Sequence, residues 1–123
     1  MYTVKVRHSI MIAHSLPNPF FGPAQGMHGA TYVVDITFSS ETLDEHNVVI
    51  DIGKAKSVTK TILDQLNYKN LDELPHFKGH LTTTEFVAKY IHDCVKSDTA
   101  DFFEGKIAVT LGETHDAWAS YSG

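Results

Sequence analysis

Histidine is the residue type with the widest range of chemistry in this chain, whose 123 residues include eight histidines. An imidazole can bind a metal ion, transfer a proton near neutral pH or lie on the surface without a role. His115 follows Glu113 by two positions, so on a regular strand the two side chains would point to the same side. His115 is therefore a candidate catalytic acid or base. The alternative is a residue in the turn between two strands.

The single cysteine, Cys94, excludes an internal disulfide bond and a metal site built from several cysteines. It lies on the apolar side of a predicted helix, where we expect a buried core thiol. Four histidines fall in predicted loops or on the polar side of that helix, and we expect them on the surface: His46, His76, His80 and His92.

The first half of the chain has the pattern of strands. Polar and apolar residues alternate over Tyr2–Arg7, and the apolar run that ends at Ala13 continues this strand. Prolines and glycines between Leu16 and Met27 predict a loop of about ten residues, a length that is often functional. β-branched and aromatic residues predict a second strand over Thr31–Phe38, and Asn47–Ile52 a short third strand or a strand extension.

The middle of the chain predicts two helices. Asp51 can cap the first helix, in which apolar residues recur on one face. Thr82 and Glu85 have the spacing of a capping box at the start of the second helix, which apolar residues at helical spacing continue to Val95. The apolar face of the first helix consists of Ala55, Val58, Ile62 and Leu66.

Two further strands, Ile107–Leu111 and Ala117–Tyr121, complete the predicted order. Helices grouped between pairs of strands indicate the α+β class, with a four-stranded antiparallel sheet and two helices packed on one face. The length indicates a single domain over residues 1–123. Such a sheet has open edges, which are normally closed by pairing or oligomerisation.

Composition limits the setting and the partners of the chain. The net charge of −5 argues against a general nucleic-acid binder, which needs a basic face. No stretch approaches the roughly 18 consecutive apolar residues of a membrane span, and the first residues lack the apolar core of a signal peptide. We therefore expect a cytoplasmic protein that binds neither nucleic acid nor membranes.

Five segments, taken in order, resemble the 6-pyruvoyltetrahydropterin synthase and 6-carboxytetrahydropterin synthase family, whose domain is called the T-fold. Ile12–Pro17 resembles the end of the family's first strand, where a histidine binds zinc. Met27–Tyr32 resembles the His-Gly-His segment that opens the second strand. Each motif is weak alone, but their order and spacing are specific for the fold. The other three segments are Leu66–Asp72, Thr82–Glu85 and Val109–Thr114.

The resemblance implies a zinc site that this sequence retains only in part. His14 and His28 fall on two of the three zinc-binding histidines of the family. The third position is Ala30, whose methyl group cannot bind a metal. Zinc in proteins has three or four protein ligands, so we expect no metal cofactor here. If a zinc ion is retained, His14 and His28 would bind it.

The acid–base group of the family is also replaced. Its catalytic cysteine, four residues before the His-Gly-His segment, falls on Ala24, and its Asp-His pair falls on Asn67 and Tyr68. An amide cannot act as a carboxylate does, and a phenol holds its proton far more tightly than an imidazole. Tyr68 is either a replacement general acid or a packed phenol. The replacements predict that the usual triphosphate-eliminating activity is lost.

The resemblance implies that the ligand pocket is better preserved than the catalytic group. A carboxylate can accept neighbouring N–H groups of an aminopyrimidine edge side by side, and Glu113 lies at the family's position for this contact. The alternative is a strand carboxylate in an ordinary ion pair. The other expected ligand-binding residues are Thr83, Thr84, Gln25, His14 and His28.

Two functions of different classes follow. The first is a protein that binds a pterin-like or purine-like small molecule without a reaction of its own. The second is an active lyase of pterin or queuosine precursor biosynthesis, acting on 7,8-dihydroneopterin triphosphate with altered acid–base residues such as His115, with or without zinc. For both, the resemblance implies a homo-oligomer, a trimer or a hexamer, in which the sheets join into a barrel and the sites lie between subunits.

Overall fold

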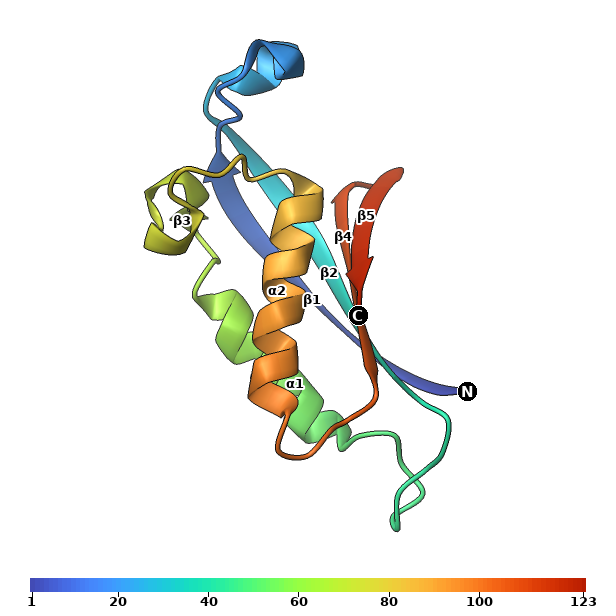
Figure 1. The fold of residues 1–123 in the computed structure, drawn as a ribbon. Helices are drawn as coiled ribbons and strands as arrows, with labels where there is room; N and C mark the ends of the chain where they lie inside the picture. Colours follow the sequence, from blue (N-terminus) through green and yellow to red (C-terminus); the bar gives the residue numbers. More distant parts are fainter.

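The computed structural model describes residues 1–123, and its central feature is a long antiparallel pair of strands (Figure 1). β1 (Tyr2–His14) and β2 (His28–Ser40) pair along their whole length, so His14 lies opposite His28 at one end. Alternate residues of β2 from Tyr32 to Phe38 are fully buried, as the period-two pattern predicts.

Three more strands complete one sheet in the order β3-β1-β2-β4-β5. β4 (Lys106–Thr114) pairs antiparallel with β2, and β5 (Ala117–Ser122) pairs antiparallel with β4. β3 (Lys69–Asn70) has two residues and runs parallel to β1, which makes the sheet mixed. The α+β class is confirmed, with this short fifth strand as an addition. The sheet is not closed within one chain, because β5 and most of β1 each have a neighbouring strand on one side only.

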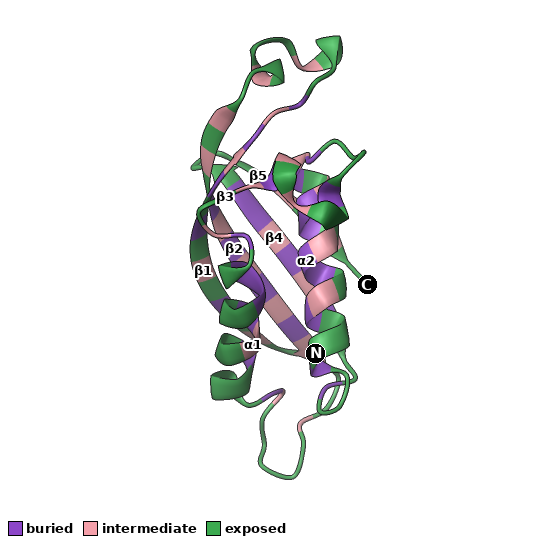
Figure 2. Cartoon of the chain, turned by 90° about the vertical axis from the view of Figure 1, so that its left-hand side faces the viewer, coloured by how far each residue is buried: buried purple, intermediate pink, exposed green.

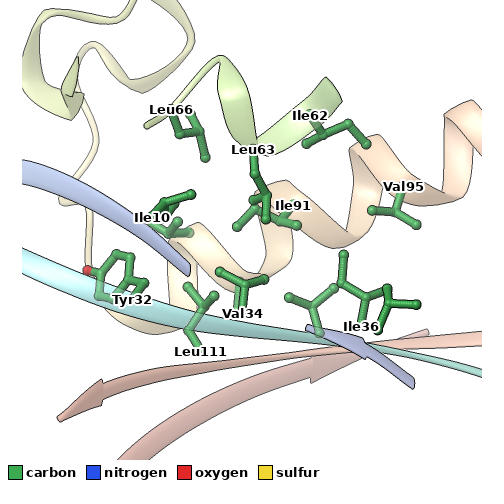
Figure 3. Packing of buried hydrophobic residues seen from close by; sticks show 14 of the residues in the cluster. Ile10, Tyr32, Val34, Ile36, Ile62, Leu63, Leu66, Ile91, Val95 and Leu111 are labelled. Atoms are coloured by element: carbon green, nitrogen blue, oxygen red, sulfur yellow. The ribbon is translucent and has the colours of Figure 1, made fainter. Parts of the chain in front are cut away.

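Two α-helices, α1 (Ile52–Asp64) and α2 (Thr84–Thr99), cover one face of the sheet. Figure 2 shows the buried residues as bands across β2 and β4 behind these helices. In Figure 3, Leu63 and Ile91 from the helices point toward Val34 and Ile36 of β2. Neither helix is long and apolar enough to cross a membrane.

The two helix starts test the sequence predictions at single residues. Asp51 caps α1 as predicted, since its carboxylate accepts the Lys54 N–H at 3.1 Å. The prediction that Thr82 caps the second helix, in a capping box with Glu85, is wrong by one residue. Thr83 is the N-cap of α2, and its hydroxyl accepts the Phe86 N–H at 3.2 Å.

The strand predicted over Asn47–Ile52 is also wrong, because residues 41–51 form turns and bends. The Asp44 carboxylate accepts the N–H groups of His46 and Val48, which folds this segment back on itself. Asn47 has a φ of 60°, a left-handed conformation that is incompatible with a strand. The apolar character of the run reflects the burial of Ile50.

Three further details differ from the sequence predictions. Leu16–Met27 is not structureless, since the 3₁₀ helix η1 (Pro19–Gln25) forms within it. His92 is buried against Tyr121 rather than exposed on the polar side of α2. Cys94 is half-buried at the margin of the core, and burial raises the pKa of its thiol. His46, His76 and His80 are exposed, as predicted.

Candidate functional site

The residues singled out by the sequence gather where four elements end or begin. His14 is the last residue of β1, His28 is the first residue of β2, and Thr84 is the first residue of α2. Glu113 lies one residue before the end of β4. In Figure 1 these ends lie at the same end of the sheet, on the side from which η1 projects. The fold therefore brings together side chains that are far apart in sequence.

The two histidines form a close pair whose ring nitrogens have distinct roles. Their ring centroids are 4.6 Å apart, with 63° between the ring planes. His14 Nδ1 lies 3.0 Å from the carbonyl oxygen of Thr82, and His28 Nδ1 lies 2.8 Å from that of Gly26. A carbonyl oxygen only accepts, so each Nδ1 carries the hydrogen and donates it. In the neutral rings, both Nε2 atoms are therefore left as acceptors.

His14 is the more unusual of the pair, because it is 1% exposed. Its Nε2 atom is buried and has no hydrogen-bond partner, which is costly unless a bound group supplies one. Burial lowers the pKa of His14, and the neighbouring His28 ring lowers it further. The Thr82 carbonyl and the carboxylates of Asp72 and Glu113 act in the opposite direction. These effects favour a neutral ring with a free, buried acceptor.

Glu113 and Thr84 are joined by a hydrogen bond, in which the Thr84 hydroxyl donates to Glu113 Oε2 at 3.2 Å. Glu113 is exposed, so its carboxylate can still reach a ligand from solvent. Tyr32 lies beneath this pair, fully buried, and its hydroxyl also has no partner in hydrogen-bond geometry. Burial raises the pKa of Tyr32 to about 12, so the phenol stays protonated.

Two residues of this site were missed by sequence reasoning. Thr82 was assigned to a helix cap, but its hydroxyl lies 3.0 Å from His14 Nδ1, beside its own carbonyl. Tyr32 was treated only as a strand residue. The available signal was that Tyr32 lies in the alternation of β2 that begins at His28, because residues two apart on a strand share a face. Asp72 fixes the chain just beyond His14, since it accepts both the N–H and the hydroxyl of Ser15.

Other predicted site residues lie at the margin or make local contacts. Thr83 caps α2. Gln25 is exposed at the end of η1 and donates to the Gly22 carbonyl at 3.0 Å. His115 lies in the exposed turn between β4 and β5, as the alternative assignment predicted. This placement leaves its imidazole open to solvent.

Asn67 and Tyr68, for which the resemblance implies an Asp-His pair in the family, lie beside β1. Asn67 Oδ1 accepts the Met11 N–H at 2.9 Å, and the Tyr68 N–H donates to the Met11 carbonyl. The Tyr68 side chain is 78% exposed, and its φ of 61° is uncommon for a bulky residue. The alternative in which the phenol of Tyr68 is packed inside the protein is therefore excluded within a single chain.

The residues at this end of the sheet do not fit a zinc ion held by protein ligands alone. The two imidazoles have Nδ1 engaged by carbonyl oxygens, which leaves only their Nε2 atoms, and Ala30, the next residue on the same face of β2, offers no ligand atom. No third histidine, cysteine or carboxylate lies within metal-binding reach of both rings. The one group of three such residues, Asp44, Glu45 and His46, is fully exposed in the turn before α1. It adjoins a broad surface pocket at the opposite end of the sheet.

Comparisons with known proteins agree with this architecture. The sequence profile described as 6-pyruvoyl tetrahydropterin synthase matches residues 3–123. The chain is 29% identical over 106 residues to 6-pyruvoyl tetrahydrobiopterin synthase of Dictyostelium discoideum, covering 84% of this chain and 76% of that protein. It is 28% identical over 115 residues to 6-carboxy-5,6,7,8-tetrahydropterin synthase of Bacillus subtilis, covering 91% and 79%. Its structure is similar to that of 6-pyruvoyl tetrahydropterin synthase of Caenorhabditis elegans, with a TM-score of 0.87 and 26% identity over 99% of this chain and 95% of that one.

Proposed function

The chain belongs to the 6-pyruvoyl tetrahydropterin synthase family, and we propose that it binds a pterin-like or purine-like small molecule without eliminating triphosphate. The observation that supports binding is the Thr84–Glu113 pair beside the buried, unpartnered Nε2 of His14. A carboxylate held in this way can accept two neighbouring N–H groups of an aminopyrimidine ring. The buried Nε2 of His14 has no hydrogen-bond partner within the chain, which supports a site that a bound group completes.

The loss of the reaction rests on the side chains that replace the catalytic ones. Ala30 and Ala24 carry methyl groups, which neither bind metal nor move protons. Asn67 has an amide in place of a carboxylate, and that amide is already engaged by the Met11 N–H. His14 and His28 therefore lack the third metal ligand and the neighbouring acid–base group with which the family's elimination works.

A change at Glu113 tests the ligand assignment. Hydrogen bonds to a charged acceptor are worth about 1.5–3 kcal/mol, so Glu113→Gln should weaken binding of 7,8-dihydroneopterin about 10- to 150-fold. Isothermal titration calorimetry measures this affinity, and Glu104→Gln, an exposed carboxylate just before β4, is the matched control. Equal affinity of the wild type and Glu113→Gln would refute the anchor.

A second candidate function, an active lyase, is favoured by the names of the relatives, which are synthases. In that case the exposed imidazole of His115 would supply acid–base chemistry. Incubation with 7,8-dihydroneopterin triphosphate, followed by analysis of triphosphate release and pterin products, separates the two functions. Our proposal predicts no release above the uncatalysed background. Turnover that is lost in His115→Gln would establish the lyase instead.

We also propose that the chain forms a homo-oligomer, a trimer or a hexamer, in which the sheets join into a barrel. The open edges of β1 and β5 support this, since unpaired strand edges are normally covered. Sedimentation equilibrium gives the subunit number, and a monomer at micromolar concentration would contradict the proposal. A cytoplasmic location is part of the same proposal.

A further inference from the structure

We propose that Tyr32 is a positioning residue of the ligand site. Its buried hydroxyl donates a hydrogen bond to the Thr84 hydroxyl when a ligand binds Glu113, and this bond holds the carboxylate in place. The assignment rests on the proposed function, because it concerns the same pocket. It gives a role in binding to a side chain that acts through Thr84 and Glu113 rather than by contact with the ligand.

The strand ladders stop just short of Glu113. The β2–β4 register ends at the pair Val33–Gly112, so Tyr32 and Glu113 are the next residues on the two strands. The β4–β5 register is irregular between Gly112 and Thr114, and Glu113 has no partner residue in it. An irregularity of this kind can redirect a side chain. Because no cross-strand pair fixes Glu113, the orientation of its carboxylate depends on the contacts of the side chain.

The Thr84 hydroxyl is the contact that orients this carboxylate. It donates to Glu113 Oε2 at 3.2 Å, and Thr84 itself is buried at the start of α2. A hydroxyl has one hydrogen, which is used here, and lone pairs that can accept. The oxygen of Thr84 can therefore accept a hydrogen bond from a second donor. Such a bond would fix the hydroxyl in the orientation in which it serves Glu113.

Tyr32 is the side chain that can supply this second donor. It is fully buried, and its hydroxyl has no partner in hydrogen-bond geometry. Burial raises the pKa of Tyr32 to about 12, while the neighbouring Thr84 hydroxyl acts in the opposite direction. The phenol is therefore protonated, and it lies beside a hydroxyl that has a free lone pair.

The unpartnered hydroxyl links this contact to binding. A buried hydroxyl without a partner is costly, so a hydrogen bond that forms only with the ligand adds to affinity and not to the stability of the free protein. A ligand that engages the Glu113 carboxylate fixes the Thr84 hydroxyl with it and gives Tyr32 an ordered acceptor. The three groups then form a chain of donors that ends on a charge, in which each bond strengthens the next.

Tyr32→Phe tests the assignment, because it removes the hydroxyl and keeps the ring. Calorimetric titration with 7,8-dihydroneopterin should show about 2- to 12-fold weaker binding, the value of one net hydrogen bond. The midpoint of urea unfolding without ligand, at one fixed protein concentration, should equal or exceed that of the wild type, because the hydroxyl that is removed has no partner. Tyr121→Phe is the matched control. It removes the hydroxyl of a half-buried phenol on β5 and should leave the affinity unchanged.

Two variants of Thr84 test the route from Tyr32 to Glu113. In Thr84→Ser, which keeps a hydroxyl, Tyr32→Phe should weaken binding by the same factor as in the wild type. In Thr84→Val, which removes the hydroxyl with little change of shape, Tyr32→Phe should have no further effect on affinity. The same loss in both backgrounds would overturn a role through Thr84.

The remaining outcomes separate this assignment from the proposed function. If the wild type does not bind 7,8-dihydroneopterin, the proposed function is wrong and the assignment falls with it. If binding depends on Glu113 and is unchanged in Tyr32→Phe, only the role of Tyr32 is overturned. A lower unfolding midpoint in Tyr32→Phe would also overturn it, because the hydroxyl would then stabilise the protein before any ligand binds.

Discussion

His92 is expected to stabilise the packing of the last strand against α2, although the sequence places it on the polar side of that helix. The ring is 2% exposed, and its Nε2 donates to the Gly123 carbonyl at 3.1 Å. Its Nδ1 lies 2.9 Å from a carboxylate oxygen of Asp93, and its edge packs on Tyr121 at 4.7 Å between centroids. We predict that His92→Ala lowers the free energy of unfolding by about 2–3 kcal/mol.

The magnitude follows from what the substitution removes. The hydrogen bond to Gly123 contributes about 1 kcal/mol. Loss of the buried ring and its contact with Tyr121 contributes about 1–2 kcal/mol more, less than the loss of a phenylalanine because imidazole is smaller and polar. The Asp93 side chain is 53% exposed, so the contact with it contributes only a few tenths of a kcal/mol. At this chain length the change corresponds to a fall of about 8–12 °C in Tm.

Urea unfolding followed by circular dichroism, at one fixed protein concentration, measures the effect. His92→Phe separates the two contributions, because it keeps a packed ring and removes the hydrogen bond, and should cost about 1 kcal/mol. His46→Ala is the matched control, since that histidine is exposed and should cost less than about 0.5 kcal/mol. If His92→Ala and His46→Ala unfold at the same urea concentration, the reasoning about the buried ring is refuted.

Three other predictions concern a cap, an ion pair and the metal position. Thr83→Ala should cost about 1 kcal/mol of unfolding free energy in urea titrations, because Thr83 rather than Thr82 caps α2. Asp35 accepts two hydrogen bonds from Arg7, at 2.6 and 2.9 Å, and this contact holds the pKa of Asp35 below its usual range. The contribution of the ionised Asp35 carboxylate to stability is therefore fully present above its unfolded pKa of about 3.9, and it is lost as pH falls through the lower pKa of the folded state. Asp35→Asn should therefore lower the free energy of unfolding at pH 7 and match the wild type near pH 2. Ala30→His should convert weak zinc binding into a stoichiometric complex, measured by competition with a chelating dye, because it adds a third imidazole to the face that carries His28. An unchanged zinc affinity in that variant would mean that the three positions do not converge.

The parts of the fold that the sequence predicted correctly are those set by local patterns. Alternation followed by an apolar run located β1, and β-branched and aromatic residues located β2. Asp51 was recognised as a helix cap from its own side chain. The prediction of a strand over Asn47–Ile52 was wrong because a short apolar run has no period that distinguishes a strand from a buried turn. The two residues of β3 gave no signal, since their pairing depends on where Asn67 docks on β1.

The parts that could not be predicted depend on contacts between distant segments. Three consecutive threonines follow Leu81, and only the docking of Thr82 against His14 decides which of them caps the helix. His92 is buried because β5 packs beside α2, which helical periodicity cannot reveal. At the site, the Thr84 hydroxyl donates to Glu113, two residues for which the resemblance implies a shared role in ligand binding. The acceptor roles of the two histidines required the backbone carbonyls, which no side-chain pattern encodes.

The replaced residues keep contacts that hold the fold while they lack the groups that carry out the reaction. Asn67 accepts the Met11 N–H through its carbonyl oxygen, a contact that needs an acceptor but no charge. Ala30 pairs with Ile12 near the His14–His28 end of the β1–β2 register, where strand pairing requires only the backbone. Asp72 still fixes the chain after His14 through two hydrogen bonds from Ser15. Since none of these contacts depends on a metal or on proton transfer, the fold and the pocket can persist without the reaction. These contacts are therefore compatible with the binding function that we propose.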